Sequence, residues 1–346
     1  MKQLLNTLYI TTPDSYLSRD GTNLVISIGG SEVGRIPAFN IEQVMCFGYA
    51  GASTSAMKLC CENNISMSFM TPHGKFLMGV HGETKGNVLL RREQYRIADD
   101  ESRAIQIGRN MIAGKVANSR QLIRKSRSNH MDRLDTPLIN DSISVLTASL
   151  DQIRASDNCG SLRGFEGDAS RTYFKVFDSL ILVDKEDFFF RCRNRRPPRD
   201  RVNSLLSFVY SMLMRDVESA LEAVGLDPYV GFIHTDRPGR PSLALDLMEE
   251  LRPLADRVVI SLINLRKVKS DGFIEEAGGA VTMTDETRRI VIDAWQTRKN
   301  TEVNHPFLKE RVKLGLVPHI QSMLLAKCIR GELEKYPPFL IPQAIL

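Results

Sequence analysis

Short apolar runs separated by turn residues fill the first 80 positions of the chain. The runs are rich in β-branched and aromatic residues, with Gly, Asp and Asn between them, and their sequences are TLYI, NLVISI, EVGRI, QVMCFG, SMSFM and KFLMGV. This pattern is typical of short β-strands joined by tight turns. One helical pattern interrupts it over residues 53–63, with Ser53 as the expected N-cap. The pattern predicts a small β-rich N-terminal domain over residues 1–88.

After Arg91 and Arg92 the pattern changes to long helical periodicity, which continues to about Tyr336. The clearest predicted helix begins after Asp200, a suitable N-cap, and ends at Gly225, a residue suited to a left-handed C-cap. It is apolar on most faces, so we expect it at the centre of its domain. The predicted fold class is therefore α+β, with a larger, mainly α-helical catalytic domain over residues 89–346.

Composition narrows the class of protein. The chain has 346 residues, of which 42% are hydrophobic and 25% charged, as expected for a folded protein. No apolar run approaches the roughly 18 residues of a membrane span, and the N-terminus lacks the features of a signal peptide, so we expect a cytoplasmic protein without membrane contact. The six cysteines lack zinc-ribbon or redox-pair spacing, which favours buried, inert thiols. No phosphate-binding loop motif is present.

Positive charge is concentrated in two stretches. Residues 85–133 hold 12 lysines and arginines against 5 acids, and residues 191–201 hold six arginines around one aspartate, within a net charge of only +5. Such clusters can neutralise the phosphates of a nucleic-acid backbone. Taken singly, a charged stretch is more often a solvated surface. The clusters therefore support nucleic-acid binding only if they lie beside a catalytic site.

An acid lies between two glycines in the segment LRGFEGD, over residues 162–168, immediately before a helical pattern. The glycines would let the backbone bring Glu166 close to a ligand. The alternative is an ordinary acid that is favourable at the start of a helix. Both interpretations stay open at this point.

A histidine and two further acids follow in the sequence. His234 ends the apolar run YVGFI at the edge of a turn, a place where a histidine is more often structural than functional. Asp246 and Glu249 lie three residues apart, on one face of a helix predicted to begin at Ser242 and to end near Pro253. A Glu, a His and a further carboxylate form a ligand set that suits Mg²⁺ or Mn²⁺. Such an ion assists phosphoryl transfer on nucleic acid.

The sequence resembles a known family, the CRISPR-associated integrase/endonuclease of the spacer-acquisition (adaptation) module, and most of all its type I-C-like members. The resemblance covers nearly the whole chain, and its specific stretches are LRGFEGDASRTYF (162–174), RNRRPPRDRVNSLLSFVYSML (193–213), GLDPYVGFIHTDRPGRPSLALDLMEELRP (225–253) and KCIRGELEKYPPF (327–339). It implies a metal-dependent DNA endonuclease and strand-transferase of antiviral defence. The enzyme would insert short foreign-DNA spacers into the CRISPR repeat array by attack of a 3′-hydroxyl on a phosphodiester.

The resemblance also implies roles for individual residues. Glu166, His234 and Glu249 match the family's metal ligands and catalytic residues, with Mg²⁺ or Mn²⁺ as the ion. Asp246 lies one turn before Glu249, so either acid could be the direct third ligand, and we favour Glu249. The candidate accessory residues, which either pack or contact DNA, are Asp246, Tyr173, Asn203 and Tyr210. The predicted DNA-binding residues are Arg193, Arg195, Arg196, Arg199, Arg237 and Arg240.

The implied partners are double-stranded DNA, as spacer precursor and as CRISPR repeat, a second copy of the chain, and a small ferredoxin-like CRISPR-associated adaptation partner protein. We expect the homodimer interface in the N-terminal domain. Two alternatives remain: a free-standing metal-dependent DNA nuclease, in which water replaces the attacking hydroxyl, and a non-catalytic DNA-binding scaffold. The intact metal-ligand candidates argue against the scaffold.

Overall fold

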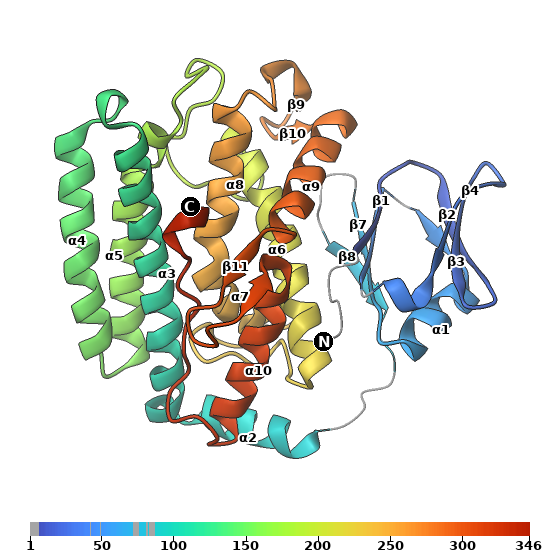
Figure 1. Cartoon of the computed structure of the whole chain (residues 1–346), viewed down its shortest axis with the longest axis horizontal. Helices are drawn as coiled ribbons and strands as arrows, with labels where there is room; N and C mark the ends of the chain where they lie inside the picture. Colours follow the sequence, from blue (N-terminus) through green and yellow to red (C-terminus); the bar gives the residue numbers. More distant parts are fainter. Residues whose placement is uncertain (1–6, 42, 49, 72–75, 81, 83–86) are drawn as a thin grey trace. The chain divides into compact units, whose positions relative to one another are not determined.

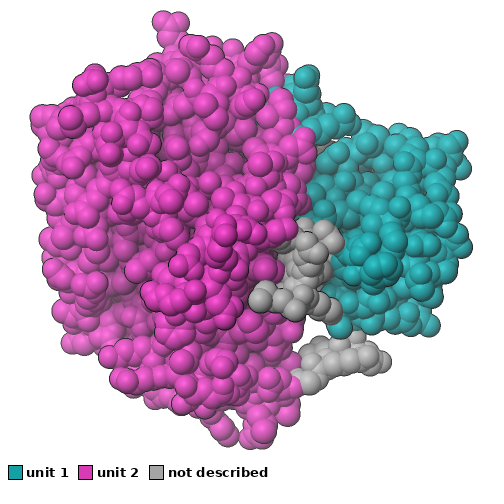
Figure 2. Space-filling view, viewed as in Figure 1, with its two compact units in different colours: residues 1–86, 283–289 teal, residues 87–282, 290–346 magenta. Residues whose placement is uncertain are grey.

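The computed structural model describes residues 7–346 except 42, 49, 72–75, 81 and 83–86 (Figure 1). The chain divides into two compact units, residues 1–86 with 283–289 and residues 87–282 with 290–346 (Figure 2). Strands dominate the first unit and helices the second, which confirms the α+β class. The domain boundary after residue 88 stays a prediction, because residues 83–86 lie outside the described residues.

The first unit contains two four-stranded sheets. In one, β1, β5 and β7 run parallel and β8 pairs antiparallel with β7; the bounds are β1 (Thr7–Ile10), β5 (Gln43–Phe47), β7 (Ser66–Met70) and β8 (Phe76–Val80). In the other, β2, β3 and β4 form an antiparallel meander and β6 runs parallel to β2; the bounds are β2 (Ser15–Asp20), β3 (Asn23–Ile28), β4 (Ser31–Pro37) and β6 (Gly51–Ala52). The predicted strands are present, although Lys75 of KFLMGV lies outside the described residues.

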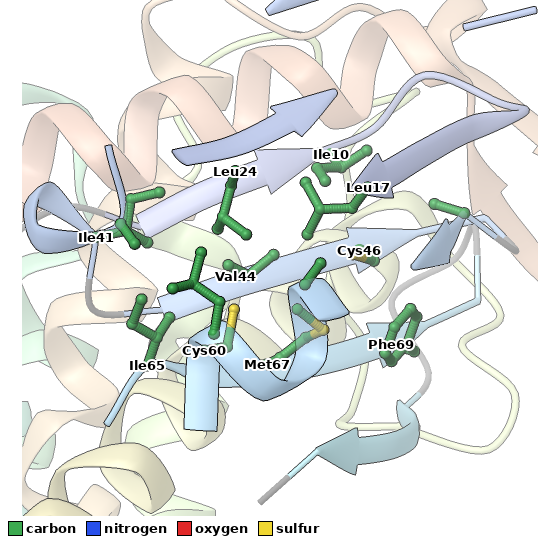
Figure 3. Close-up of a cluster of buried hydrophobic side chains, with 14 residues drawn as sticks. Ile10, Leu17, Leu24, Ile41, Val44, Cys46, Cys60, Ile65, Met67 and Phe69 are labelled. Atoms are coloured by element: carbon green, nitrogen blue, oxygen red, sulfur yellow. The ribbon is translucent and has the colours of Figure 1, made fainter. Parts of the chain in front are cut away.

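Apolar side chains from both sheets and from α1 (Thr54–Glu62) form one buried cluster in this unit (Figure 3). Ser53 caps α1 as predicted, because its side chain accepts a hydrogen bond from the backbone N–H of Ala56 at 3.2 Å. Cys46 and Cys60 lie in the cluster, where burial raises the pKa of each thiol to about 12. These two cysteines therefore act as small hydrophobic side chains.

Helices form most of the second unit, although residues 285–289 of α9 (Asp285–Lys299) belong to the first unit. Their bounds are α2 (Val88–Asp99), α3 (Glu101–Asn129), α4 (Thr136–Ala155), α5 (Cys159–Phe177), α6 (Arg201–Val224), α7 (Ser242–Met248), α8 (Arg252–Asn264), α9 (Asp285–Lys299) and α10 (Val317–Ile329). Figure 1 shows α3, α4 and α5 side by side, and α6 packs against α7, α8 and α10. No helix in the described part of the chain is long and apolar enough to cross a membrane.

The bounds of α6 agree with the sequence prediction because a capping residue defines each end of the helix. Asp200 accepts a hydrogen bond from the backbone N–H of Asn203 at 2.7 Å, and Gly225 takes a left-handed φ of 90°. Other short strands were missed by the hydrophobic pattern. They are β2 and β6 in the first unit, and later in the chain β9 (Phe273–Glu275), β10 (Val281–Met283), β11 (Glu302–Asn304) and β12 (Arg311–Lys313). Strands of two or three residues are too short to show a period of two, and β2 (SYLSRD) ends in three polar residues.

Two glycines let α3 lie unusually close to its neighbours. A Cβ at Gly108 would lie 2.7 Å from Cγ1 of Ile233. A Cβ at Gly114 would lie 2.8 Å from Cβ of Pro338 and 3.2 Å from Cβ of Glu250. The backbone of α3 is therefore in direct contact with the segments that precede His234 and follow Glu249 in the sequence.

We predict that Gly114→Ala destabilises the protein whereas Gly164→Ala does not. Both glycines are inside helices, so alanine should gain about 1 kcal/mol of helix propensity at each position. At Gly164 a Cβ meets no atom within 4 Å, but at Gly114 it meets the rigid ring of Pro338. We expect overpacking to cost Gly114→Ala about 1–3 kcal/mol and to lower its thermal unfolding midpoint. Equal stabilisation by both substitutions would show that α3 is not in tight contact.

Candidate active site

Glu166, His234 and Glu249 line one cavity of about 290 Å³ in the second unit. They come from three separate segments: α5, the loop between α6 and α7, and the 3₁₀ turn η4 (Glu249–Leu251). The remaining lining residues are Ile112, Arg163, Ile233, Thr235, Arg237 and Arg240. The structure thus gathers in one place the three residues that the sequence singled out as metal ligands.

Glu166 lies in the middle of α5, so the prediction that it stands at a helix start is wrong. The helix begins at Cys159, because the side chain of Asn158 accepts a hydrogen bond from the backbone N–H of Ser161 at 2.8 Å. The flanking glycines continue the helix. The carboxylate of Glu166 accepts a hydrogen bond from Ser170 Oγ, one turn later, at 2.7 Å.

The carboxylate of Asp246 holds the segment that carries His234. Its Oδ2 accepts the backbone N–H groups of Phe232 at 2.6 Å and Ile233 at 2.9 Å. Its Oδ1 accepts the backbone N–H of His234 at 3.0 Å and lies 2.6 Å from Nδ1 of the same residue. Because an ionised carboxylate only accepts hydrogen bonds, Nδ1 carries the proton and Nε2 is the nitrogen with a lone pair for a ligand. Asp246 is completely buried and orients the imidazole.

This arrangement requires glycine at position 231. A Cβ there would lie 2.7 Å from Oδ2 of Asp246 and 2.9 Å from the backbone carbon of Ser242. Gln94 of α2 fixes the start of the same segment, because its Nε2 donates to the backbone oxygens of Asp227 at 2.8 Å and Val230 at 2.9 Å. The His234 segment is therefore held at both ends by buried polar side chains.

The single helix predicted from Ser242 to near Pro253 is divided into α7, η4 and α8. The first of these helices begins at Ser242 as predicted, and the hydroxyl of Ser242 donates to the backbone oxygen of Thr235 at 3.3 Å. Pro253 lies in the first turn of α8, where its missing N–H costs nothing, so it begins a helix and does not end one. Asp246, in α7, supports His234, and Glu249, the first residue of η4, lines the cavity.

Glu249 is buried between two cations. Its Oε1 lies 3.0 Å from Nε of Arg252, and its Oε2 lies 2.7 Å from Nζ of Lys115. The same Nζ also forms an ion pair with Oε1 of Glu166. Burial by itself would raise the pKa of Glu249, but the charges of Arg252 and Lys115 outweigh it and lower the pKa to about 2. Glu249 is therefore an anion at neutral pH.

The donor set fits a small, hard divalent cation. Two carboxylates and one imidazole nitrogen line the cavity, and both carboxylates already contact one cationic nitrogen. Within the described ranges, no three His, Cys, Asp or Glu side chains stand close enough together to hold an ion without rearrangement. Lys115 stands between two of the candidate ligands, so an ion would have to take its position.

The predicted DNA-binding arginines fall into three groups. Arg237 and Arg240 line the cavity. Arg195, Arg196 and Arg199 are exposed in the segment before α6. Arg193 instead donates to Asn203 Oδ1 and to Ser207 Oγ, and burial lowers its pKa to about 10. Arg193 thus helps to hold this segment on α6.

The candidate accessory residues lie in the packed interior. The hydroxyl groups of Tyr173 and Tyr210 both donate to the carboxylate of Asp256 in α8. The guanidinium of Arg252 lies 4.9 Å from the ring centroid of Tyr210, which connects this group to Glu249. Asn203 Nδ2 donates to the Cys192 backbone oxygen at 2.9 Å and so supports the start of α6. These contacts favour packing roles, and direct DNA contacts by these residues stay a prediction.

Sequence reasoning missed Lys115, Arg163, Ser170 and Thr235. Lys115 belongs to the basic stretch 85–133, but nothing in its spacing distinguishes it from the other cations of that stretch. Arg163 and Thr235 lie inside segments that the sequence analysis quoted, but only their place on the cavity wall identifies them.

Comparisons with known proteins identify the family of the chain. The family profile described as CRISPR associated protein Cas1 matches residues 8–297. CRISPR-associated endonuclease Cas1 1 of Chlorobaculum tepidum is 43% identical, over 98% of this chain and 99% of that protein. CRISPR-associated endonuclease Cas1 2 of Rhodospirillum rubrum is 45% identical, over the same shares.

Two solved structures share the fold. A casposase bound to integration product superimposes with a TM-score of 0.84 at 22% identity, covering 98% of this chain and 94% of that chain. A Cas6-RT-Cas1–Cas2 complex gives a TM-score of 0.82 at 22% identity, covering 99% of this chain and 36% of that chain. At this level of identity the likeness shows a common architecture.

The pKa of Asp256 predicts a measurable pH dependence of stability. Burial raises this pKa from 3.8 to about 6, against the lowering effect of the two tyrosine hydroxyls. The folded state therefore binds a proton more tightly than the unfolded state between these values. The contribution of Asp256 to stability should fall as pH rises from about 4 to about 6, by up to about 1.4 kcal/mol per pH unit.

Asp256→Asn removes this titration. Relative to the unmodified protein, the variant should gain unfolding free energy as pH rises through that window, as measured by urea unfolding at several pH values. A difference that stays constant from pH 4 to pH 7 would contradict the raised pKa.

Proposed function

The chain belongs to the CRISPR-associated Cas1 family, and we propose that its cavity catalyses spacer integration into double-stranded DNA with Mg²⁺ or Mn²⁺. Curated relatives with the endonuclease name match nearly the whole chain at 43% and 45% identity, so the chain is an enzyme of this kind. The observation that supports the site is the meeting of Glu166, His234 and Glu249 in one cavity.

In this proposal the three residues have distinct tasks. Glu166 and Glu249 offer anionic oxygens, and His234 offers Nε2, with the ring held by Asp246. A bound Mg²⁺ or Mn²⁺ would stabilise charge that develops on the phosphodiester and lower the pKa of the attacking hydroxyl. Of the two acids that could be the third ligand, Glu249 is preferred over Asp246, because the oxygens of Asp246 are occupied by the His234 segment.

Arginines on the cavity wall would position the phosphate. Arg163, Arg237 and Arg240 surround the acidic residues, and guanidinium groups bind phosphate oxygens in a bidentate manner. The 3′-hydroxyl of the captured DNA forms a new bond to phosphorus while the bond to the repeat's own 3′-oxygen breaks. One phosphodiester replaces another, and the proton lost by the attacking hydroxyl is balanced by one gained at the leaving oxygen. The exchange needs no nucleotide hydrolysis.

The partners proposed from the sequence are consistent with the family. One structural neighbour is bound to an integration product, and another is a Cas1–Cas2 assembly. We extend to this chain the binding of spacer-precursor and repeat DNA, and of a small adaptation protein with a ferredoxin-like fold. A type I-C-like subtype and a cytoplasmic location belong to the same proposal.

The proposal includes a homodimer, because integration requires one strand transfer on each side of the repeat and one cavity cannot serve both positions. We place the interface in residues 1–88. The edge strand β4 and the turn after it expose two apolar side chains, Val33 at 58% and Phe39 at 79%. An edge strand with exposed apolar side chains is suited to pairing with a second copy.

Strand transfer into a supercoiled plasmid that carries a repeat tests the catalytic proposal. With Mn²⁺ and a short duplex with free 3′-hydroxyls, His234→Ala and Glu166→Gln should each reduce product by roughly 100-fold or more, and chelation should abolish it. Asp168→Asn is the control, because Asp168 lies on the same helix but is exposed and pairs with Arg171. Undiminished strand transfer by His234→Ala would overturn the site, and cleavage without transfer would favour the free-standing nuclease.

The exposed arginines should position DNA without taking part in the chemistry. Replacing Arg195, Arg196 and Arg199 with glutamate should weaken DNA binding for every sequence. It should also flatten the salt dependence by roughly 0.9 log units for each phosphate that the segment no longer neutralises. The control is Arg311→Glu, because Arg311 has a side chain 79% exposed in β12, outside the cluster. A salt dependence equal to that of the unmodified protein would mean that the segment is only solvated.

A further inference from the structure

The ammonium group of Lys115 lies between the two acidic residues of the cavity. It forms an ion pair with Oε1 of Glu166, and Nζ lies 2.7 Å from Oε2 of Glu249. The exposed side-chain fractions are 14% for Lys115, 27% for Glu166 and 6% for Glu249. Three charges thus share a place with little access to water, where their interactions are stronger than at the surface.

The fold fixes Lys115 at this place through its neighbours on α3. Gly114 allows the helix backbone to approach Glu250 closely. One turn later, the buried Nδ2 of Asn118 donates to the backbone oxygen of Glu250 at 2.7 Å and to that of Phe339 at 2.8 Å. The segment of α3 that carries Lys115 is therefore attached to the turn that carries Glu249, so the backbone of Lys115 stays beside both acids while its side chain can still move.

Two ionised carboxylates this close together need a cation. Without one, their mutual repulsion and the loss of hydration would both destabilise the folded protein. Arg252 compensates Glu249 on its other oxygen, whereas the ammonium group of Lys115 forms ion pairs with both acids. Lys115 therefore keeps the pair together in the folded protein.

A divalent ion would compete with Lys115 for these carboxylates, because Lys115 and Arg252 already contact the two oxygens of Glu249. Carboxylate oxygens bind Mg²⁺ at about 2.0–2.1 Å, which leaves no room for an ammonium group between the ion and its ligands. The two cations therefore exclude each other at Glu166 and Glu249.

We propose that Lys115 is a positioning residue that holds Glu166 and Glu249 together before the metal ion binds and leaves both carboxylates when the ion enters. This inference rests on the proposed function, in which these two acids are metal ligands. Metal binding is then a competition with an internal cation. The lysine keeps the acids close together in the metal-free protein, and its displacement reduces metal affinity.

The test uses the full-length protein and Lys115→Gln. Isothermal titration with Mn²⁺ should give an affinity roughly tenfold higher for the variant, because no ion pairs have to break. In the absence of metal the variant should unfold at a lower temperature, and Mn²⁺ should raise its midpoint by more than it raises that of the unmodified protein.

Lys299→Gln is the matched control. It removes the ion pair of Lys299 with Asp216, whose side chains are 9% and 8% exposed, outside the cavity that Glu166 lines. This control should lower the unfolding midpoint and leave the Mn²⁺ affinity unchanged. If Lys115→Gln binds Mn²⁺ no more tightly than the unmodified protein does, the proposed competition between Lys115 and the metal ion is overturned.

A second measurement requires no substitution. Brief acetylation of the unmodified protein, followed by mass spectrometry, should show that Mn²⁺ increases the reactivity of Lys115 and leaves that of Lys299 unchanged. Reactivity of Lys115 that falls or stays constant while Mn²⁺ binds overturns the inference and leaves the metal site intact. If the unmodified protein binds no Mn²⁺ at all, the metal site of the proposed function fails, and the competition fails with it.

Discussion

The buried carboxylate of Asp246 is the interaction on which the cavity depends. It accepts three successive backbone N–H groups and the Nδ1 proton of His234, so one side chain fixes both the path of a loop and the orientation of an imidazole. A buried carboxylate without such donors would be strongly destabilising, so the loop and the acid stabilise each other. Gly231 is required because no other residue lets the backbone approach so closely.

Charge balance explains the contacts around the buried carboxylate of Glu249. Glu249 is buried as an anion because Arg252 and Lys115 lie on its two oxygens, and Arg252 in turn packs on the ring of Tyr210. Tyr210 and Tyr173 then bind Asp256. A cavity with acidic ligand candidates and cationic walls is suited to a divalent ion and a phosphodiester together, which is the chemistry of spacer integration. The same network gives Tyr173 and Tyr210 a packing role through their hydrogen bonds to Asp256.

Much of this protein could be predicted from local sequence. The α+β class, the capped ends of α1 and α6, and the choice of Glu166, His234 and Glu249 rest on residue types and spacing within short windows, or on family motifs within them. The strands and helix ends among these features depend on backbone preferences and side-chain caps that act over a few residues, so a short stretch of sequence can show them. The short strands β9 to β12 could not be predicted, because three residues are too few to show the alternation of a strand.

Tertiary structure alone decided how the chemical groups are used. The sequence placed Asp246 and Glu249 on one helical face, and only the tertiary contacts show that Asp246 holds the His234 segment while Glu249 lines the cavity. Nothing local marks Lys115, whose position between Glu166 and Glu249 results from the packing of α3 through Gly114 and Asn118. Composition and periodicity describe neighbours along the chain, but the electrostatics of a buried site are set by neighbours in space.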